Sequence, residues 1–482
     1  MKFEVVIRYV GMVLLLNAGF MLLAAMISLF NGMDTGLYPL LLSFMITAIV
    51  GVFPLIFVSG KNIIISAKEG YLIVIISWLA SCVVGMLPYI IWGGEFSITN
   101  GWFESVSGFT TTGATILEDI EGLPRGLLFW RSSTHWLGGV GVVLFALVIL
   151  PSIGRSKLTL SSVELSDIAR ENFKFNTRKI LRIIIVVYVG LTLAETILLL
   201  VAGMDWFDAI TTSFSTVATG GFSTKNQSIM FYHSFWIEAI ITVFMLAGAI
   251  HFGLIYATLM GKRNNIFSSE VTRYFLACIL GAGLLVAINL YTSNTYSNFG
   301  EALRYGIFQV TAYGTTTGFA SASGASWPGF TILLMIFISI QCGCAGSTSG
   351  GVKADRVLIL LKSIRARILK LQHPNAIIRL KLNGITQEDS TVNAAILLIS
   401  FYLIVALVST LLLTATNIDL LTAFSSSTSC LSNVGPGFGL VGNLENMDFF
   451  AGPIKIWLSI LMIFGRLELF GLIHLLLIRS WR

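Results

Sequence analysis

The sequence is poor in charged residues. They make up 11% of its 482 positions, and hydrophobic residues make up 55%, whereas about a quarter of the residues in a typical soluble domain are charged. This shortage excludes an ordinary soluble protein and predicts a polytopic membrane protein. The formal net charge of +6 comes from basic residues in short segments between apolar runs, which indicates membrane topology and not a nucleic-acid-binding surface.

Residues that carry covalent, redox or metal chemistry are also scarce. The five cysteines either fall in apolar runs or stand too close together for an ordinary bridge, so we expect core packing and no disulfide framework. No histidine pair has the spacing of metal ligands, and we find no Ser/His/Asp set and no nucleotide-binding glycine string. We therefore expect no enzyme and no organic cofactor in this chain. The residues concerned are Cys82, Cys278, Cys342, Cys344, Cys430, His135, His233, His251, His373 and His474.

Long apolar runs dominate what is present. A membrane-spanning helix needs about 20 mostly apolar residues, and ten runs meet this requirement. The first run, 5–30, is too long for the apolar core of a signal peptide and lacks a clear cleavage site, so we expect no cleavable signal. Together with 37–58 it forms a leading hairpin. The other eight runs are 71–93, 128–150, 183–203, 235–260, 274–292, 330–361, 392–415 and 454–479.

A string rich in threonine and glycine occurs four times, each time between two apolar runs. Counted from Gly113 to Gly220, Gly318 and Gly435, the intervals are 107, 98 and 117 residues. Each copy therefore belongs to a unit of about a hundred residues, which is the mark of an internal repeat. The copies span Ser107 to Ala114, Thr216 to Gly221, Gly314 to Phe319 and Ser432 to Gly437.

Strings of this kind can line a filter for ions. An ion that leaves water needs its hydration shell replaced, and backbone carbonyls from four short loops can do this. Turning successive carbonyls inward requires positive φ, which glycine adopts without steric cost, while a neighbouring threonine adds a hydroxyl and stiffens the strand. The predicted filter residues are Thr110, Thr111, Thr112, Gly113, Val217, Ala218, Thr219, Gly220, Thr315, Thr316, Thr317, Gly318, Ser432, Asn433, Val434 and Gly435.

The sequence thus predicts an all-α polytopic membrane protein with four pseudo-symmetric repeats around one pore. Each repeat consists of a span, a half-length re-entrant pore helix, the filter string and a second span. Non-helical backbone at membrane depth is tolerated only inside protein or beside water, which a pore provides. The expected units are the hairpin at 1–65 and pore repeats at 66–160, 161–265, 266–375 and 376–482.

Basic residues indicate the orientation of the spans. With the amino terminus in the cytoplasm, 24 of the 30 lysines and arginines fall in cytoplasmic segments, five fall outside and one, Arg466, lies within a span. This obeys the positive-inside rule, puts both termini in the cytoplasm and turns all four filters toward the outer face. The basic segments 155–182 and 362–381 fit an acidic regulatory partner or anionic lipid head groups, and they fit ordinary cytoplasmic loops equally well.

Each predicted pore helix carries an acidic residue at or near its start. A carboxylate there is favoured by the helix dipole and can cap free amides. It also gives the outer mouth a negative potential that concentrates cations, and the two roles are compatible. The four residues are Glu104, Asp208, Glu301 and Asp419.

The second span of repeat three is interrupted by glycines. Gly343, Gly346, Gly350 and Gly351 stand among other small residues, and each glycine disfavours continuous helix by roughly 1 kcal/mol relative to alanine. One interpretation is a helix that packs tightly through small residues. The other is a loop beneath the filter that obstructs permeation until it moves, with Lys353 helping to anchor it.

Arg466 lies about twelve residues inside the last span. A charge near the membrane centre costs at least about 2.5 kcal/mol, so its side chain must face protein or water. A pair with an acidic residue is one explanation, although Glu468 lies on another face of the helix. We favour a position facing the pore below the filter, where the charge raises the barrier to cations.

These features together resemble the TrkH/TrkG/KtrB superfamily of potassium transporters, over essentially the whole chain. The resemblance rests on the four strings, the ten-span layout and three further runs. The leading hairpin makes the chain similar to TrkH more than to KtrB. The runs are Arg131 to Gly141, Cys344 to Lys353 and Gly465 to Glu468.

The resemblance implies potassium as the substrate, taken up through a pseudo-fourfold pore in the bacterial cytoplasmic (inner) membrane. It also implies a homodimer embedded in membrane lipid, a cytoplasmic ring of TrkA-type nucleotide-binding regulatory subunits, and gating by the glycine-rich loop. It matches Gly113, Gly220, Gly318 and Gly435 to the filter glycines of the family. Glycine in place of serine at position 113 favours potassium over sodium, and the divergent fourth string implies weaker selectivity than in a true tetrameric channel.

Other functions compete with this one. A secondary transporter also uses broken helices, but typically around a site between two inverted repeats, and four repeats of parallel topology argue against it. A membrane enzyme would need a catalytic constellation, which the sequence lacks. The nearest rival is a sodium-permeable or sodium/proton-coupled transporter of the same architecture. No intramembrane carboxylate relay stands out, so symport stays open.

Overall fold

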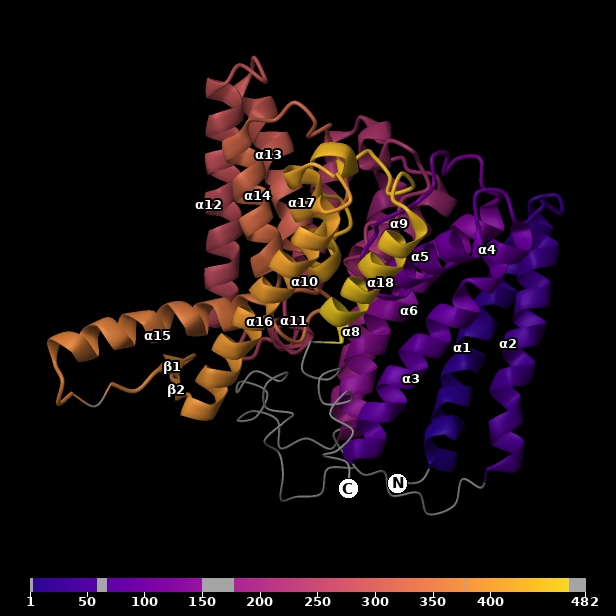
Figure 1. The fold of residues 1–482 in the computed structure, drawn as a ribbon, viewed down its shortest axis with the longest axis horizontal. Coiled ribbons are helices and arrows are strands. Elements are labelled where there is room, and N and C mark those ends of the chain that lie inside the picture. Colours follow the sequence, from indigo (N-terminus) through magenta and orange to yellow (C-terminus); the bar gives the residue numbers. More distant parts are fainter. Residues whose placement is uncertain (1–2, 59–66, 150–176, 377, 468–482) are drawn as a thin grey trace.

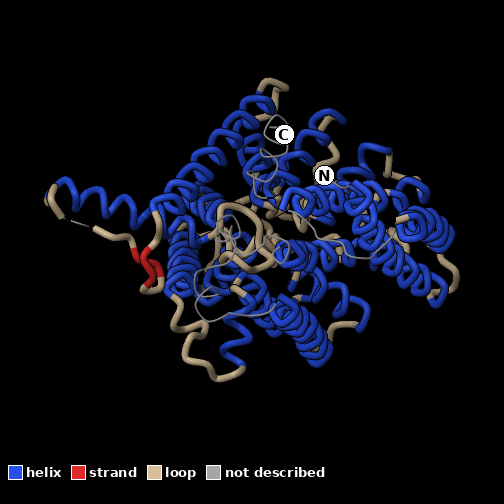
Figure 2. The backbone as a smooth tube through the Cα atoms, turned by 90° about the horizontal axis from the view of Figure 1, so that it is seen from below, coloured by secondary structure: helices blue, strands red, loops and turns tan. Residues whose placement is uncertain are grey.

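A computed structural model describes residues 3–58, 67–149, 177–376 and 378–467. It confirms the predicted all-α fold class, because the only strands in the described chain are two short ones, β1 (Lys381–Leu382) and β2 (Ile385–Thr386), paired antiparallel. The long helices run side by side (Figure 1). Seen from below, they surround a central region that contains loops (Figure 2).

The leading hairpin consists of α1 (Phe3–Phe30) and α2 (Leu37–Phe57). Glycines let the two helices approach closely, since a Cβ added at Gly11 would lie 2.6 Å from the Gly51 carbonyl oxygen. The buried Asn17 of α1 donates a 2.8 Å hydrogen bond to Ser81 of α3 (Ala67–Gly85). The hairpin thus docks against the first repeat through a polar contact that fixes its depth.

Four groups of helices follow the hairpin, and each contains a short helix that ends at one of the glycine strings. These four short helices, α5, α9, α13 and α17, are the predicted pore helices. Repeat one comprises α3, α4 (Leu87–Trp92), α5 (Ile98–Phe109) and α6 (Arg125–Ile149), and repeat two comprises α8 (Thr177–Val201), α9 (Trp206–Val217), η2 (Ser228–Tyr232), α10 (Phe235–Ala249) and α11 (Phe252–Leu259). Repeat three comprises α12 (Glu270–Thr292), α13 (Phe299–Gly314), α14 (Gly329–Gln341) and α15 (Ala354–Gln372), and repeat four comprises α16 (Asp389–Thr414), α17 (Leu420–Ser432), η3 (Gly439–Val441) and α18 (Gly452–Arg466).

Six of the described helices are long and apolar enough to cross a membrane, and a seventh span is counted when α10 and α11 are joined. The sequence predicted ten spans. Of the other three, α6 is described with its side chains only as far as Gly141, and α14 ends at the interruption of its span. The last helix, α18, is described only in part, because most of its predicted continuation to 479 lies outside the described residues.

Each pore helix begins at a side-chain cap. In each of the four helices the cap accepts a hydrogen bond of 2.9–3.2 Å from a backbone amide of the first turn. Such caps satisfy amides that have no partner inside the helix, so four different sequences start their pore helices in the same way. The caps are Ser97, Asp205, Asn298 and Asp419.

The acidic residues predicted at these helix starts need one correction. Asp419 is itself a cap, and Asp208 and Glu301 lie in the first turns of α9 and α13. Glu104 does not lie near a helix start, because α5 begins at Ile98 and places this carboxylate in its middle, fully buried.

Two of the predicted spans are broken. The predicted interruption of 330–361 is present, since α14 ends at Gln341 and α15 begins at Ala354 and projects away from the bundle (Figure 1). The continuous span predicted at 235–260 is wrong, because α10 and α11 meet at an angle of 110°. The Nδ1 atom of His251 caps the second segment by accepting a 2.9 Å hydrogen bond from the Gly253 amide.

Candidate functional site

The four strings share one backbone conformation although their sequences differ. In each copy a left-handed residue is followed two positions later by a glycine of positive φ. The amide between the two donates to the carbonyl five residues earlier, at 2.8–3.0 Å in all four copies. The left-handed residues are Thr111, Thr219, Thr316 and Asn433, with φ of 51°, 53°, 61° and 59°, and the glycines are Gly113, Gly221, Gly318 and Gly435, with φ of 82°, 86°, 73° and 96°.

This shared conformation corrects the register of repeat two by one residue. The sequence matched Gly220 to Gly113, but the residue with the conformation of Gly113 is Gly221. Gly220 corresponds instead to Thr112, since each of the two amides donates to the carbonyl five residues earlier. The loop segment of repeat two is therefore 218–221 and not 217–220, and Val217 is the last residue of α9. Two adjacent glycines made the choice ambiguous from sequence.

The four glycines close a ring. A Cβ added at any of them would lie 1.9–2.4 Å from a carbonyl oxygen of the next repeat, and in each case this is the carbonyl of the residue just before the next glycine. Cβ atoms essentially never come this close to backbone, so only glycine fits at these positions. The contacts run from Gly113 to Gly220, from Gly221 to Thr317, from Gly318 to Val434 and from Gly435 back to Thr112.

This arrangement suits a dehydrated cation. One backbone carbonyl per repeat lies against the neighbouring glycine around the ring, and carbonyl oxygens can replace the hydration shell of an ion. Two further oxygens beside the ring, Thr111 Oγ1 and Asn433 Oδ1, are buried without a hydrogen-bond partner. Buried polar atoms without partners are costly, and both oxygens belong to left-handed residues of the strings.

On one side the ring opens into a cavity of about 120 Å³. All four ring glycines line it, together with the acidic residues Glu118 and Glu445 and the basic residues Arg131 and Lys225. The four carboxylates expected to attract cations here, Glu104, Asp208, Glu301 and Asp419, are not among the residues that line this cavity. Asp208 accepts hydrogen bonds from Thr224 and Tyr232 and pairs with Lys225 at 3.4 Å.

On the other side, the residues between α14 and α15 lie directly against the ring. We call residues 342–353 the interrupting loop. Its Ser349 Oγ lies 3.1 Å from Thr316 Oγ1, and the Gly350 amide donates to the same oxygen at 3.2 Å. A Cβ at Gly350 would lie 2.6 Å from the Ser432 carbonyl oxygen. The loop thus contacts the filter strings of repeats three and four at once.

The interrupting loop also pairs with the break between α10 and α11. The amides of Cys344 and Thr348 donate to the carbonyls of Ala249 and Gly248, at 2.8 and 3.2 Å, and the Phe252 amide donates to the Gly346 carbonyl at 3.2 Å. Each break therefore provides hydrogen-bond partners for the backbone groups that the other break leaves free. Backbone polar groups at membrane depth need such partners because the hydrocarbon supplies none.

Arg466 reaches the interrupting loop. Its buried guanidinium donates to the Thr348 carbonyl and, at 3.3 Å, to the Gly138 carbonyl of α6. Within the described part of the chain, the hydrogen-bond acceptors of this guanidinium are these two carbonyls. Glu468, the acidic residue considered as its partner, lies outside the described residues. Lys353, at the end of the loop, is buried and has a left-handed backbone with φ of 75°.

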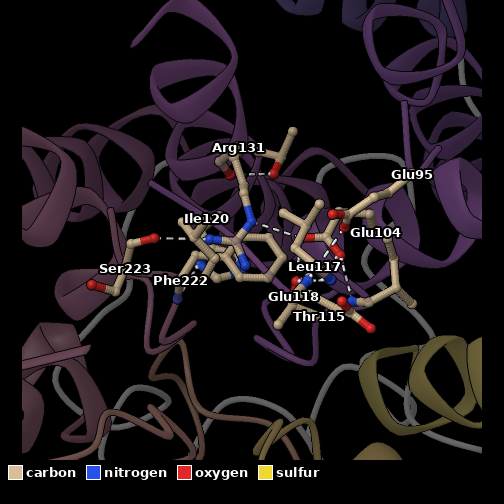
Figure 3. Close-up of polar contacts among 12 residues, drawn as sticks. Glu95, Glu104, Thr115, Leu117, Glu118, Ile120, Arg131, Phe222 and Ser223 are labelled. Atoms are coloured by element: carbon tan, nitrogen blue, oxygen red, sulfur yellow. Dashed lines mark hydrogen bonds and ion pairs between the residues drawn. The ribbon is translucent and has the colours of Figure 1, made fainter. Parts of the chain in front are cut away.

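The sequence did not identify a buried polar cluster on the cavity side of the ring. Arg131 of α6 forms a 2.6 Å ion pair with Glu104, donates a 2.9 Å hydrogen bond to the Ser223 carbonyl and lies 3.6 Å from the Phe222 ring centre (Figure 3). One turn later, His135 stacks on the same phenylalanine. Arg131 and His135, two polar residues four positions apart in a predicted apolar span, were the feature of the sequence that could have indicated this cluster.

Three comparisons with known proteins agree. The model of the TrkH family, described as cation transport protein, matches residues 39–479. The chain is 35% identical over 490 residues to the Trk system potassium uptake protein TrkH of Salmonella typhimurium, covering both proteins completely. It is 31% identical over 427 residues to the Trk system potassium uptake protein TrkG of Escherichia coli K12, covering 88% of this chain and 87% of that protein.

A solved structure has the same fold over the whole chain. It is the crystal structure of the potassium transporter TrkH from Vibrio parahaemolyticus, with a TM-score of 0.90, 32% sequence identity and complete coverage of both chains.

Proposed function

Since the chain belongs to the TrkH family of cation transport proteins, and not to a family of enzymes, we propose that it takes up potassium ions across the inner membrane of a bacterium. The closed ring of four glycines carries the proposal, because each glycine leaves room for a carbonyl of the next repeat. Relatives named as potassium uptake proteins support potassium as the substrate. Glycine at position 113, where serine would favour sodium, supports it further.

In this proposal the ring is the selectivity filter, and its strings are 110–113, 218–221, 315–318 and 432–435. A potassium ion gives up water in the outer cavity and takes up carbonyl oxygens in exchange. The four pore repeats keep the predicted boundaries, with the second filter string moved by one residue. The basic residues support cytoplasmic termini.

We further propose that the interrupting loop is the gate. It lies against the filter strings of repeats three and four. Thr348 Oγ1 lies 2.9 Å from the Val217 carbonyl oxygen at the end of α9 and 3.0 Å from the Gly248 carbonyl oxygen, and its one proton is shared between them. A loop held by three repeats closes the pathway until these bonds are exchanged. Arg466 adds a hydrogen bond to the same segment.

Assembly into a homodimer and regulation by a cytoplasmic ring of TrkA-type nucleotide-binding subunits complete the proposal. The resemblance to the family supports both. Coupling to protons or sodium, a symport, is the alternative to a gated pore.

The deciding experiment measures cation influx into liposomes that contain the purified protein, under the same imposed gradient for potassium, rubidium and sodium. We expect potassium and rubidium to enter well ahead of sodium. Equal sodium influx would refute a potassium filter. Influx that follows an imposed proton or sodium gradient, with no potassium gradient present, would favour the coupled transporter instead.

The gate has its own test. Thr348→Val removes the hydroxyl that bonds two carbonyls but keeps the size of the side chain, whereas Thr348→Ser keeps the hydroxyl. We expect rubidium influx to rise several-fold in Thr348→Val and in Arg466→Ala, and to stay near the wild-type rate in Thr348→Ser. Unchanged influx in the first two variants, in protein that elutes as folded, would exclude the loop as the barrier.

A further inference from the structure

The filter string of repeat two lacks a side chain that the other repeats have. The residue just before the ring glycine is Thr112, Thr317 or Val434 in repeats one, three and four, but it is Gly220 in repeat two. A string without a side chain at this position has nothing of its own to pack behind it. Some other group must fill the space, because protein interiors are close-packed.

His135 of α6, which belongs to repeat one, fills this space. A Cβ added at Gly220 would lie 2.3 Å from His135 Nδ1, so the imidazole occupies the volume of the missing side chain. The fully buried ring stacks on Phe222 with centroids 4.0 Å apart and planes 14° apart, and Nδ1 accepts from the Phe222 amide at 3.4 Å.

The pore helix of repeat two holds its string by a side-chain contact, because Asp208 accepts a 2.7 Å hydrogen bond from Thr224 Oγ1, three residues after the ring glycine. The pore helices of repeats one and three contact the backbone at this position. Nine residues before the ring glycine, repeats one and three carry Glu104 and Gln309, and each accepts the amide three residues after that glycine, from Ile116 and Ser321, at 3.2 Å. Repeat two carries Thr212 there, with a shorter side chain.

Arg131, one helical turn before His135, adds a contact to the backbone of the repeat-two string. Its guanidinium donates to the Ser223 carbonyl and covers the ring of Phe222 (Figure 3), so it holds the two residues that follow Gly221. Its Nε donates to Glu104, which in turn holds repeat one. A buried ion pair is maintained only when its remaining hydrogen bonds are made, and both residues make them. The pair therefore links two adjacent strings of the ring.

We propose that Arg131 and His135 are positioning residues that support the filter string of repeat two from the neighbouring repeat, and that this support sets the discrimination between potassium and sodium. The inference rests on the proposed function. Discrimination depends on where the carbonyls stand, and repeat two contributes the Gly220 carbonyl to the ring. Without the α6 side chains this carbonyl is free to move toward a smaller ion.

The first test is the double variant Glu104→Gln/Arg131→Gln, which removes the ion pair without leaving a lone buried charge. Its matched control is Arg125→Gln, which removes a positive charge from the exposed start of the same helix. The readout is the ratio of rubidium to sodium influx in liposomes. We expect this ratio to fall at least roughly threefold in the double variant, the value of about one net hydrogen bond, with rubidium influx retained, and to stay unchanged in the control.

The second test is a cycle of Gly220→Ala, His135→Ala and the combination of both. Gly220→Ala alone collides with the imidazole, and His135→Ala alone leaves a void, so each is expected to lower the rubidium-to-sodium ratio and the melting temperature. The combination returns a side chain to the empty space and is expected to recover part of both losses, which is a non-additive result. Phe222→Leu, which leaves the ion pair in place, should lower the ratio as the double variant does.

The outcomes distinguish a failure of the proposed function from a failure of the positioning role. A wild-type protein that passes sodium as readily as rubidium refutes the proposed function. A selective wild type whose selectivity survives Glu104→Gln/Arg131→Gln, or additive losses in the cycle, overturns the positioning role and leaves the proposed function standing.

Discussion

The corrected register of repeat two leads to a sharp prediction about two adjacent glycines. Gly221→Ala should abolish selective conduction, because Gly221 and not Gly220 belongs to the ring. The added methyl group would lie 1.9 Å from the Thr317 carbonyl oxygen, where ordinary contact begins at 3.4 Å. The obstacle is backbone that itself forms part of the ring.

The magnitude follows from two costs. A left-handed backbone costs a residue with a side chain roughly 1–2 kcal/mol, and the carbonyl oxygen of Thr317 would have to withdraw by about 1.5 Å in a close-packed interior. A shift of that size moves an ion-facing oxygen by more than the size difference between sodium and potassium. We therefore expect loss of discrimination, at least tenfold in the rubidium-to-sodium ratio, together with a lower melting temperature.

A matched control separates the effect of the clash within the ring from the cost of a left-handed backbone. Gly203 also has a left-handed backbone, with φ of 94°, but no atom lies within 4 Å of a Cβ added there. Gly203→Ala therefore carries the conformational cost alone and should keep wild-type selectivity in the liposome assay. If Gly221→Ala also kept wild-type selectivity, the closed ring could not be the selecting element, and the reasoning from Cβ contacts would fail.

Two further predictions concern stability and are checked by thermal unfolding in detergent. Asp419→Ala should cost about 1 kcal/mol through loss of the α17 cap. The hydrogen bond from Thr422 lowers the pKa of Asp419, so the carboxylate stabilises the fold above its unfolded pKa of about 3.9. The difference in stability between Asp419→Ala and wild type should therefore shrink as the pH falls below that value. A difference that stays constant with pH would contradict the cap. Arg304→Met should cost about 2 kcal/mol, because it leaves the buried Glu238 without the two 2.7–2.8 Å hydrogen bonds that it accepts from Arg304. An unchanged melting temperature would show that the pair is not stabilising.

Much of the fold could be predicted because glycine acts locally. The positive φ of Gly113, Gly318 and Gly435 is a requirement of the backbone at each position, so recurring glycines between apolar runs gave the repeats and the placement of three strings. The break after Gln341 was visible for the same reason, since several glycines in a short segment disfavour helix wherever the segment lies.

Features that depend on a distant partner could not be predicted. Both Gly220 and Gly221 satisfy the motif, and only the position of His135 and the Thr317 carbonyl assigns their roles. Glu104 lies in mid-helix because α5 begins directly after the cap at Ser97, which the sequence analysis did not identify. The sharp bend after Ala249 has no glycine cluster that would have predicted it.

That bend gives the proposed gate a physical cost of opening. The carbonyls of Gly248 and Ala249 and the amide of Phe252 lose their helical partners at the break, and all three find partners in the loop. A backbone group left without a partner costs about 1–3 kcal/mol, so the loop cannot leave while the pathway is dry. Once water or ions enter from either side, they can replace these three bonds, and the cost of opening falls. We therefore expect the proposed gate to stay closed until water or a bound partner replaces the hydrogen bonds between the two breaks. A continuous helix at this position would have no such bonds to exchange.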